Sequence, residues 1–211
     1  MSVALSIWLT GLLVFIGFSA WYNNWRGRLS VVEIADYTER VKRRDEAGDG
    51  LVLNDKSILI KFMEQDNGKE FYMLNMLRLQ KAPIEHPITR EIIEPLPLLM
   101  QYFKPFITSI FARAGHPVLQ GPVVGGYIEA WNVEENPGWG AVGIIRYRSR
   151  RDMLELALNP HFDSIHIFKA LALHTTFAIP FEPNSGFVLS PRIWVGLVIA
   201  LVSAISQILI V

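Results

Sequence analysis

The chain has 211 residues, with 20 basic side chains, 20 acidic side chains and no cysteine. The zero net charge argues against a general nucleic-acid-binding protein, which carries a basic excess, so we expect no nucleic-acid partner. The absence of cysteine excludes disulfides, zinc–thiolate sites and thiol nucleophiles. Two apolar segments flank a mixed middle of about 150 residues, which is long enough for one domain with its own core.

The first apolar segment, residues 3–22, contains twenty residues without a charge. A helix of this length spans roughly 30 Å, the thickness of the hydrocarbon core of a bilayer. A cleaved signal peptide is the alternative, but no basic residue precedes the run, and Phe18 stands where a cleavage site needs a small residue. We predict a retained transmembrane helix in residues 1–25, with an aromatic and basic interfacial group at its end: Trp21, Tyr22, Trp25, Arg26 and Arg28.

The second apolar segment is residues 187–211. Ser190 is a good helix N-cap and Pro191 is tolerated at the first helical position, so we expect the helix to begin there. A buried core helix, the alternative, would show a broader polar face. Small residues recur four apart, with a glutamine near the same face, and this pattern lets another membrane helix approach closely. The residues expected to pack in the membrane are Gly196, Ala200, Ala204 and Gln207.

Basic residues set the expected orientation in the membrane. Arginines and a lysine follow the first apolar segment, Arg192 opens the second, and no Lys or Arg lies beyond the outer ends. The positive-inside rule then predicts a cytoplasmic middle and both termini on the outer side. We expect a two-pass protein of a bacterial-type inner membrane, whose partners are the lipid bilayer and either further copies of itself or other membrane subunits.

Residues 26–54 have the pattern of an amphipathic juxtamembrane helix and a linker. Ser30 and Glu33 have the spacing of a capping box. The basic cluster at residues 42–44 either contacts anionic head groups or balances the dipole at the helix end, and both interpretations stay open. The sequence Gly48-Asp49-Gly50 then breaks the helix.

Residues 55–186 are expected to form an α+β domain. Strands and helices alternate in the order β-α-β-β-α-β, a ferredoxin-like arrangement in which one antiparallel sheet carries helices on one face. The other face must be buried against something, such as a second copy. The predicted strands are 71–79, 118–131, 141–147 and 175–181, and the predicted helices are 56–65, 98–114, 151–158 and 162–173.

Glycine and proline mark the expected irregularities of this domain. A proline-rich connection, residues 80–97, is long enough to have a function or to cover another part. Pro105 predicts a kink or a restart in the long helix, and Gly115 is its expected C-cap. Gly125 and Gly126 predict a bulge or a close approach in the second strand.

Several short motifs in this domain resemble those of the dimeric α/β-barrel superfamily. The first strand has the pattern L-N-x-L-R, a glycine turn precedes the second strand, Glu129 and Trp131 lie near the end of that strand, and residues 149–162 run from Ser-Arg through a helix to Asn-Pro and an aromatic residue. The resemblance covers residues 55–181 and is strongest to small stand-alone proteins of unknown function. This chain departs from them in its terminal helices and in having Phe168-Lys169 before Ala170, where they carry His-Arg.

The resemblance implies a fold and a place for a ligand. Members of the superfamily include cofactor-free monooxygenases, haem-degrading enzymes, chlorite-converting enzymes and small isomerases, with sites between sheet and helices. The corresponding candidates for a ligand pocket here are Asn75, His116, Glu129, Trp131, Arg146 and His166.

Each candidate has a structural alternative. Asn75 either orients a ligand oxygen or is satisfied by neighbouring backbone. Glu129 is either a general base with a pKa raised by burial or the ion-pair partner of Arg146, which we favour. His116 follows a helix end, where a positive charge is favoured.

The histidines do not have the spacing of a metal site. His161 and His166 are five residues apart, off the spacing that aligns two ligands on a helix, so we predict no metal and no cofactor. A haem with one histidine ligand and a quinone-like ligand stay open.

Two functions from different classes remain. The sequence favours a non-catalytic accessory or scaffold protein, whose cytoplasmic domain dimerises or docks on a larger membrane complex. The alternative is a membrane-tethered enzyme or sensor, of the cofactor-free oxygenase or isomerase type, for an apolar small molecule. The catalytic residues are unknown at this stage.

Overall fold

The computed structural model describes residues 2–46, 55–184 and 190–210. It divides into two compact units. The first unit joins residues 1–26 to residues 183–211, and the second is residues 27–182. Each unit is described by itself.

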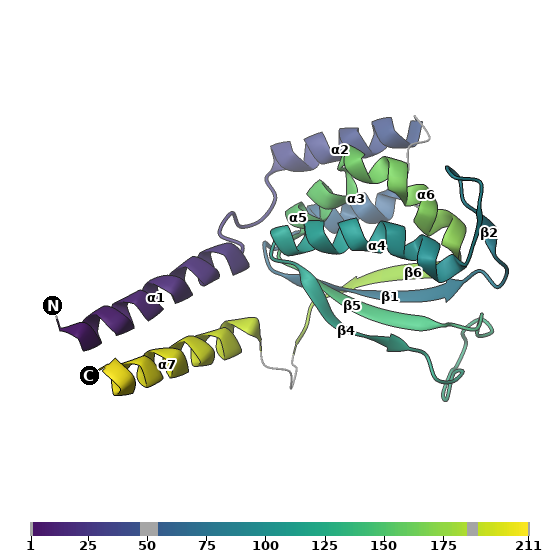
Figure 1. Cartoon of the computed structure of the whole chain (residues 1–211). Coiled ribbons are helices and arrows are strands. Elements are labelled where there is room, and N and C mark those ends of the chain that lie inside the picture. The colour runs from purple at the N-terminus through teal and green to yellow at the C-terminus, as the bar shows by residue number, and fades with distance from the viewer. Residues whose placement is uncertain (1, 47–54, 185–189, 211) are drawn as a thin grey trace. The chain divides into compact units, whose positions relative to one another are not determined.

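The first unit is an antiparallel helical hairpin of α1 (Val3–Tyr22) and α7 (Pro191–Ile210) (Figure 1). At one end, Arg192 Nε donates to Asn23 Oδ1 at 2.6 Å, and its guanidinium lies over the ring of Tyr22. Towards the other end, Trp8 Nε1 donates to Gln207 Oε1 at 2.7 Å. Both helices are long and apolar enough to cross a membrane.

Small residues let the two helices approach. Gly11 and Ser203 are both buried, and a Cβ on Gly11 would lie 2.6 Å from Ser203 Oγ. A Cβ on Gly196 would lie 3.2 Å from the ring of Phe15. Ala200, expected in the contact, is exposed instead. The row of α7 residues that contacts α1 therefore includes Gly196, Ser203 and Gln207. An α-helix has 3.6 residues per turn, so residues spaced four apart drift gradually around the helix and do not stay on one face.

The second unit contains a four-stranded antiparallel sheet in the order β4-β5-β1-β6. Its strands are β1 (Phe71–Leu79), β4 (His116–Pro122), β5 (Ala141–Tyr147) and β6 (Leu173–Phe181). Three helices, α4 (Pro95–Ala112), α5 (Arg150–Ala157) and α6 (Asp163–Ala172), cover one face, and a short 3₁₀ turn, η1 (Pro160–Phe162), precedes α6 (Figure 1). This is the predicted β-α-β-β-α-β arrangement.

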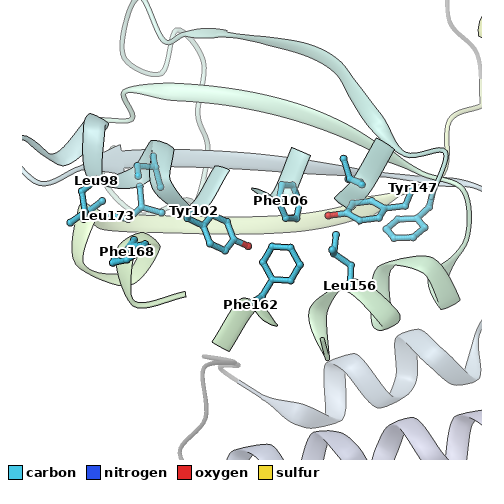
Figure 2. Close-up of a cluster of buried hydrophobic side chains, with 12 residues drawn as sticks. Leu98, Tyr102, Phe106, Tyr147, Leu156, Phe162, Phe168 and Leu173 are labelled. Carbon is cyan, nitrogen blue, oxygen red and sulfur yellow. The ribbon is translucent and has the colours of Figure 1, made fainter. Parts of the chain in front are cut away.

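Alternation along the strands separates the two faces of the sheet. On β1, Phe71, Met73 and Leu77 join the core beneath the helices. Aromatic side chains dominate this core, in which Phe71 stacks on Tyr147 and Tyr102 stacks on Phe106. Figure 2 shows Tyr102, Phe106 and Tyr147 in this core.

Among the described residues of this unit, no helix covers the opposite face of the sheet (Figure 1). The register brings apolar side chains from three strands together there. They are Tyr72, Leu74 and Met76 of β1, Val142 and Ile144 of β5, and Phe177, Ile179 and Phe181 of β6. We call this surface the open face.

A further layer covers α5. The helices α2 (Val31–Glu46) and α3 (Lys56–Glu64) share a second core with α5, in which Val41, Met63 and Leu154 are buried. Arg151 Nε donates to Glu33 Oε1 at 2.8 Å, and the predicted capping box at Ser30 and Glu33 forms.

The basic cluster of α2 has specific partners inside the unit. Arg43 pairs with Glu39 at 2.5 Å on the surface of the helix. Arg44 turns inwards, where it contacts Asp163 and donates to the carbonyl oxygen of Ala157 at 2.9 Å. The predicted break at residues 48–50 lies outside the described residues.

The second strand is shorter than predicted. It ends at Pro122, and no strand is assigned between residues 123 and 140. Proline has no N–H for the ladder and glycine weakens a strand, so the pairing stops although apolar residues follow. Gly125 and Gly126 therefore lie in an exposed loop rather than in a strand bulge.

The end of α4 also differs from the prediction. Ala114, not Gly115, takes the left-handed conformation, with φ of 55°. Gly115 is needed for space, because a Cβ there would lie 2.6 Å from Ile110 Cγ1 and 2.9 Å from the Arg146 carbonyl oxygen. The helix itself continues through Pro105.

His86 organises the proline-rich connection, which contains the short strands β2 (Ile84–Glu85) and β3 (Ile92–Ile93). The backbone N–H groups of Ile88 and Thr89 both donate to His86 Nδ1, so Nε2 carries the proton and donates to Gln101 Oε1 at 3.1 Å. The hydrogen bonds of the buried His86 therefore order this connection together with the short β2–β3 pairing.

Candidate functional site

A cavity of about 380 Å³ lies in the second unit, with walls from strands β1, β5 and β6 and from the helices on the covered face. Most of its lining is apolar, and much of it belongs to the aromatic core. A few polar groups enter it from different elements. They are Arg44 of α2, Asp55 just before α3, Asn75 of β1, Tyr102 of α4, Tyr147 of β5, and Asp163, His166 and Lys169 of α6.

Asn75 supplies a carbonyl oxygen to the cavity wall. Its Nδ2 donates to the Met73 carbonyl oxygen at 3.0 Å and, at 3.5 Å, to that of Gly143. Within the described residues its Oδ1 accepts no hydrogen bond. The backbone therefore fixes the amide, and the side-chain oxygen is left as an acceptor for a ligand donor.

His166 is neutral over the physiological range. Burial lowers the pKa of His166 to about 4, and the positive charges of Lys169 and Arg44 act in the same direction. The ring also makes an edge contact with Tyr102, with centroids 5.9 Å apart. A neutral imidazole offers one donor and one acceptor, so it suits hydrogen bonding or proton transfer more than charge pairing.

Lys169 is the cation of the cavity that has no acidic partner. Within the described residues it forms no ion pair or hydrogen bond, and its Nζ lies 5.5 Å from the centroid of the Tyr102 ring. Burial lowers the pKa of Lys169. Burial also raises the pKa of Tyr102, to about 12, so that ring stays a neutral phenol beside the ammonium.

Arg44 and Asp163 contact each other at the cavity wall. Asp55, the other carboxylate of the wall, is exposed and caps α3, so within the described residues Lys169 is left without an acidic partner. The cavity thus combines an apolar volume, a fixed amide oxygen, a neutral imidazole and one unpaired ammonium.

Two of the six predicted pocket residues, Asn75 and His166, line this cavity. His116 and Arg146 lie opposite each other on β4 and β5, on the other face of the sheet from Tyr147. His116 Nδ1 lies 3.0 Å from the Pro117 carbonyl oxygen, and burial lowers the pKa of His116, which opposes the charged form expected at a helix end.

The expected ion pair between Glu129 and Arg146 is wrong. Arg146 is 1% exposed and pairs with Glu70 at 2.6 Å, while it also donates to the Ala114 carbonyl oxygen at 2.5 Å. Glu129 and Trp131 are exposed in the loop at residues 123–140. The error follows from extending the second strand past Pro122.

The sequence prediction missed Lys169, Arg44 and the two tyrosines of the cavity. The sequence offers one signal for Lys169: the resembled proteins carry an arginine at this position. The sequence places Arg44 in the basic cluster at residues 42–44 and does not show that its side chain turns inwards. In the part of the chain that the structure describes, no three His, Asp or Glu side chains are grouped to hold a metal ion.

Comparisons with solved structures identify the fold of the second unit. A protein of unknown function from Rhodopseudomonas palustris, RPA0582, is 19% identical over 65% of this chain and 99% of its own, with a TM-score of 0.51. The methylated form of RPA0582 is 18% identical over 66% of this chain and 99% of its own, with a TM-score of 0.54. SnoaB, a cofactor-independent oxygenase from Streptomyces nogalater, is 12% identical over 57% of this chain and 99% of its own, with a TM-score of 0.36.

The likeness to RPA0582 supports the fold and leaves the activity open. The similarity to RPA0582 fits the dimeric α/β-barrel type of α+β fold that the sequence motifs suggested. No protein-family model and no curated protein matches the sequence.

Proposed function

We propose that this chain is a membrane-anchored protein whose α+β domain binds an apolar small molecule between its sheet and helices, as an enzyme or a sensor. The observation that carries the proposal is the cavity, whose volume of 380 Å³ falls in the range of roughly 300–1,000 Å³ typical of ligand sites. Few polar groups interrupt its apolar wall, as in sites that orient a ligand by one or two contacts.

The chemistry available in the cavity needs no metal. Asn75 Oδ1 is an acceptor for a ligand hydroxyl or N–H, and His166 is a neutral base within the same wall. Cofactor-free oxygenases and isomerases of the resembled superfamily work with residues of these types. The cavity therefore supports the small-molecule function better than a purely structural role.

The hairpin of α1 and α7 supports the membrane anchor. Both helices meet the length and hydropathy of a membrane span, and large apolar side chains are exposed along both of them. The basic residues Arg26, Arg28 and Arg192 are at the end that continues into the α+β domain. By the positive-inside rule we propose a cytoplasmic domain with both termini on the outer side.

The open face of the sheet favours a second, compatible role. The exposure of Leu74, Phe177 and Ile179 to water is unfavourable, and another surface that covered this face of the sheet would remove that cost. We propose that a second copy of the chain covers it. A docking role on a larger membrane complex would use the same surface.

The binding proposal is tested by native mass spectrometry of the full chain, extracted from its own membrane in a mild detergent. We expect a reproducible small-molecule mass on the wild type. Ala178 is exposed, lines the cavity and lies opposite Asn75 in the β1–β6 register, so Ala178→Trp should obstruct the cavity without repacking the core and should remove the bound mass.

The matched control is Ile88→Trp, which adds the same ring at an exposed loop position outside the cavity wall. Loss of the bound mass in both variants would indicate general destabilisation. Retention in both would show that the molecule binds elsewhere and would remove the support for the proposal.

A further inference from the structure

The charge balance of the cavity indicates the class of molecule that it takes. Four charged residues line its wall: Arg44 of α2, Asp55 just before α3, and Asp163 and Lys169 of α6. Arg44 and Asp163 contact each other, so their charges offset. Asp55 is exposed and accepts the backbone N–H of Ser57 as the N-cap of α3, so within the described residues Lys169 is the charged residue of the wall without an ion-pair or hydrogen-bond partner.

Within the described residues, neither carboxylate of the wall pairs with Lys169. Tyr102 presents its ring face at 5.5 Å from Nζ, an attractive but weak cation–π contact. His166, one turn earlier on α6, is neutral near pH 7. A lysine ammonium in such a site is destabilised by desolvation until an opposite charge arrives. The cost is relieved if the ligand brings that charge.

Position adds a second argument. Asn75 enters from the central strand β1, whereas Lys169 enters from α6 in the helical layer. A molecule held between the layers can meet the ammonium on one side and the fixed amide oxygen on the other. The aromatic side chains Phe103, Phe106 and Phe162 supply the apolar wall.

We propose that the cavity binds an apolar molecule carrying a single anionic oxygen group, such as a carboxylate, with that group held by the ammonium of Lys169. This inference rests on the proposed small-molecule function and specifies its ligand. A neutral molecule of the same apolar size would leave the lysine charge uncompensated and would bind more weakly. A molecule with two charges would bury one of them without a partner.

The test compares two probes of equal chain length, decanoate and decanol, on the full chain in mild detergent by native mass spectrometry. We expect the wild type to retain decanoate about tenfold better than decanol, the effect of one charge-assisted hydrogen bond. Lys169→Met keeps the length of the side chain and removes its charge, so decanoate should fall to the level of decanol while decanol is unchanged. Lys169→Arg should keep the preference.

The control is Lys104→Met on the exposed surface of α4, which removes a lysine outside the cavity wall and should leave both probes unchanged. Equal retention of decanoate and decanol by the wild type would overturn the inference while leaving the cavity a binding site. Unchanged decanoate retention in Lys169→Met would also overturn it. Failure of the wild type to retain either probe would instead count against the proposed function. If Lys169→Met did not fold, the wild-type preference and the Lys169→Arg variant would still decide the matter.

Discussion

The outer surface of the α1–α7 hairpin and the open face of the sheet both expose large apolar side chains, but their borders differ. On the hairpin these side chains run along both helices, and Arg192 is the one charged residue of the two spans. On the sheet they occupy one side of a domain, and Arg78 of β1 lies in the same alternating row. A surface that is apolar on all sides suits lipid, whereas a one-sided patch with polar edges suits another protein.

A third apolar surface, on α3 and α5, is already covered within the chain. There Tyr37 and Val41 of α2, and Leu29 just before it, belong to a closed core, and polar contacts fix the position of the helix. Apolar exposure alone therefore does not identify what covers a surface, whereas the distribution of charge around that surface does.

The largest expected effect comes from a charge on the hairpin. Leu13, near the middle of α1, is 67% exposed, and Leu13→Arg would place a guanidinium at the depth of the lipid chains. The cost of such a charge is roughly 2.5–3.5 kcal/mol on insertion scales, so most of the chain should be lost from carbonate-washed membranes. Leu13→Phe is the control and should remain in the membrane fraction. Full retention of the arginine variant would argue that this surface does not face lipid.

The next effect distinguishes the open face from the hairpin. Ile179, on the open face, is 51% exposed, and Ile179→Glu should weaken self-association by about 2–4 kcal/mol without releasing the chain from the membrane. The measurement is the mass of the detergent-extracted particle. Ile88→Glu, at an exposed loop position, should leave that mass unchanged. A monomeric wild type would refute the role of a second copy.

A smaller effect concerns the surface that α2 covers. The hydrogen bond from Arg151 lowers the pKa of Glu33 from 4.5 to about 2. Glu33 therefore stabilises the fold fully above about pH 4.5, and this contribution disappears as the pH falls towards 2. Glu33→Gln should cost about 1–3 kcal/mol at pH 7 and should flatten the dependence of unfolding on pH between those values. A variant with the wild-type pH dependence would show that other carboxyl groups account for acid unfolding.

The smallest effect is expected inside the hairpin. Trp8→Phe removes the hydrogen bond to Gln207 and keeps an aromatic side chain. Hydrogen bonds between membrane helices contribute about 0.6 kcal/mol on average, so the thermal unfolding midpoint in detergent should fall slightly. Trp194→Phe, at an exposed position on α7, is the control. A large loss with Trp8→Phe would mean that polar contacts, rather than small-residue packing, hold the helices together.

Sequence patterns predicted the sheet because its central strands are continuous apolar runs. Residues 71–79 and 141–147 were predicted with the bounds that the structure gives. Residues 123–131 contain the apolar and aromatic residues typical of a strand, but composition is a local property and does not reveal whether a neighbouring strand is present. The false strand also produced the false partner of Arg146, whose actual partner, Glu70, lies just before β1.

The site was predicted in part for a similar reason. Asn75 and His166 were found through a resemblance of motifs, and both line the cavity. Lys169 and Arg44 were missed, because lysine and arginine on helices are usually solvated and their sequence spacing does not show which of them turns inwards. Only packing places Arg44 against Asp163.

The position of Arg44 bears on how much of the chain is needed for a working domain. The motif resemblance begins at residue 55, yet Arg44 lies on α2 and contributes to the cavity wall, and the same helix covers Leu154. A fragment cut at residue 55 would leave Asp163 without its cation and an apolar helix surface in water. Any minimal version of this protein for crystallisation or ligand screening should therefore begin at residue 27, where the compact unit begins.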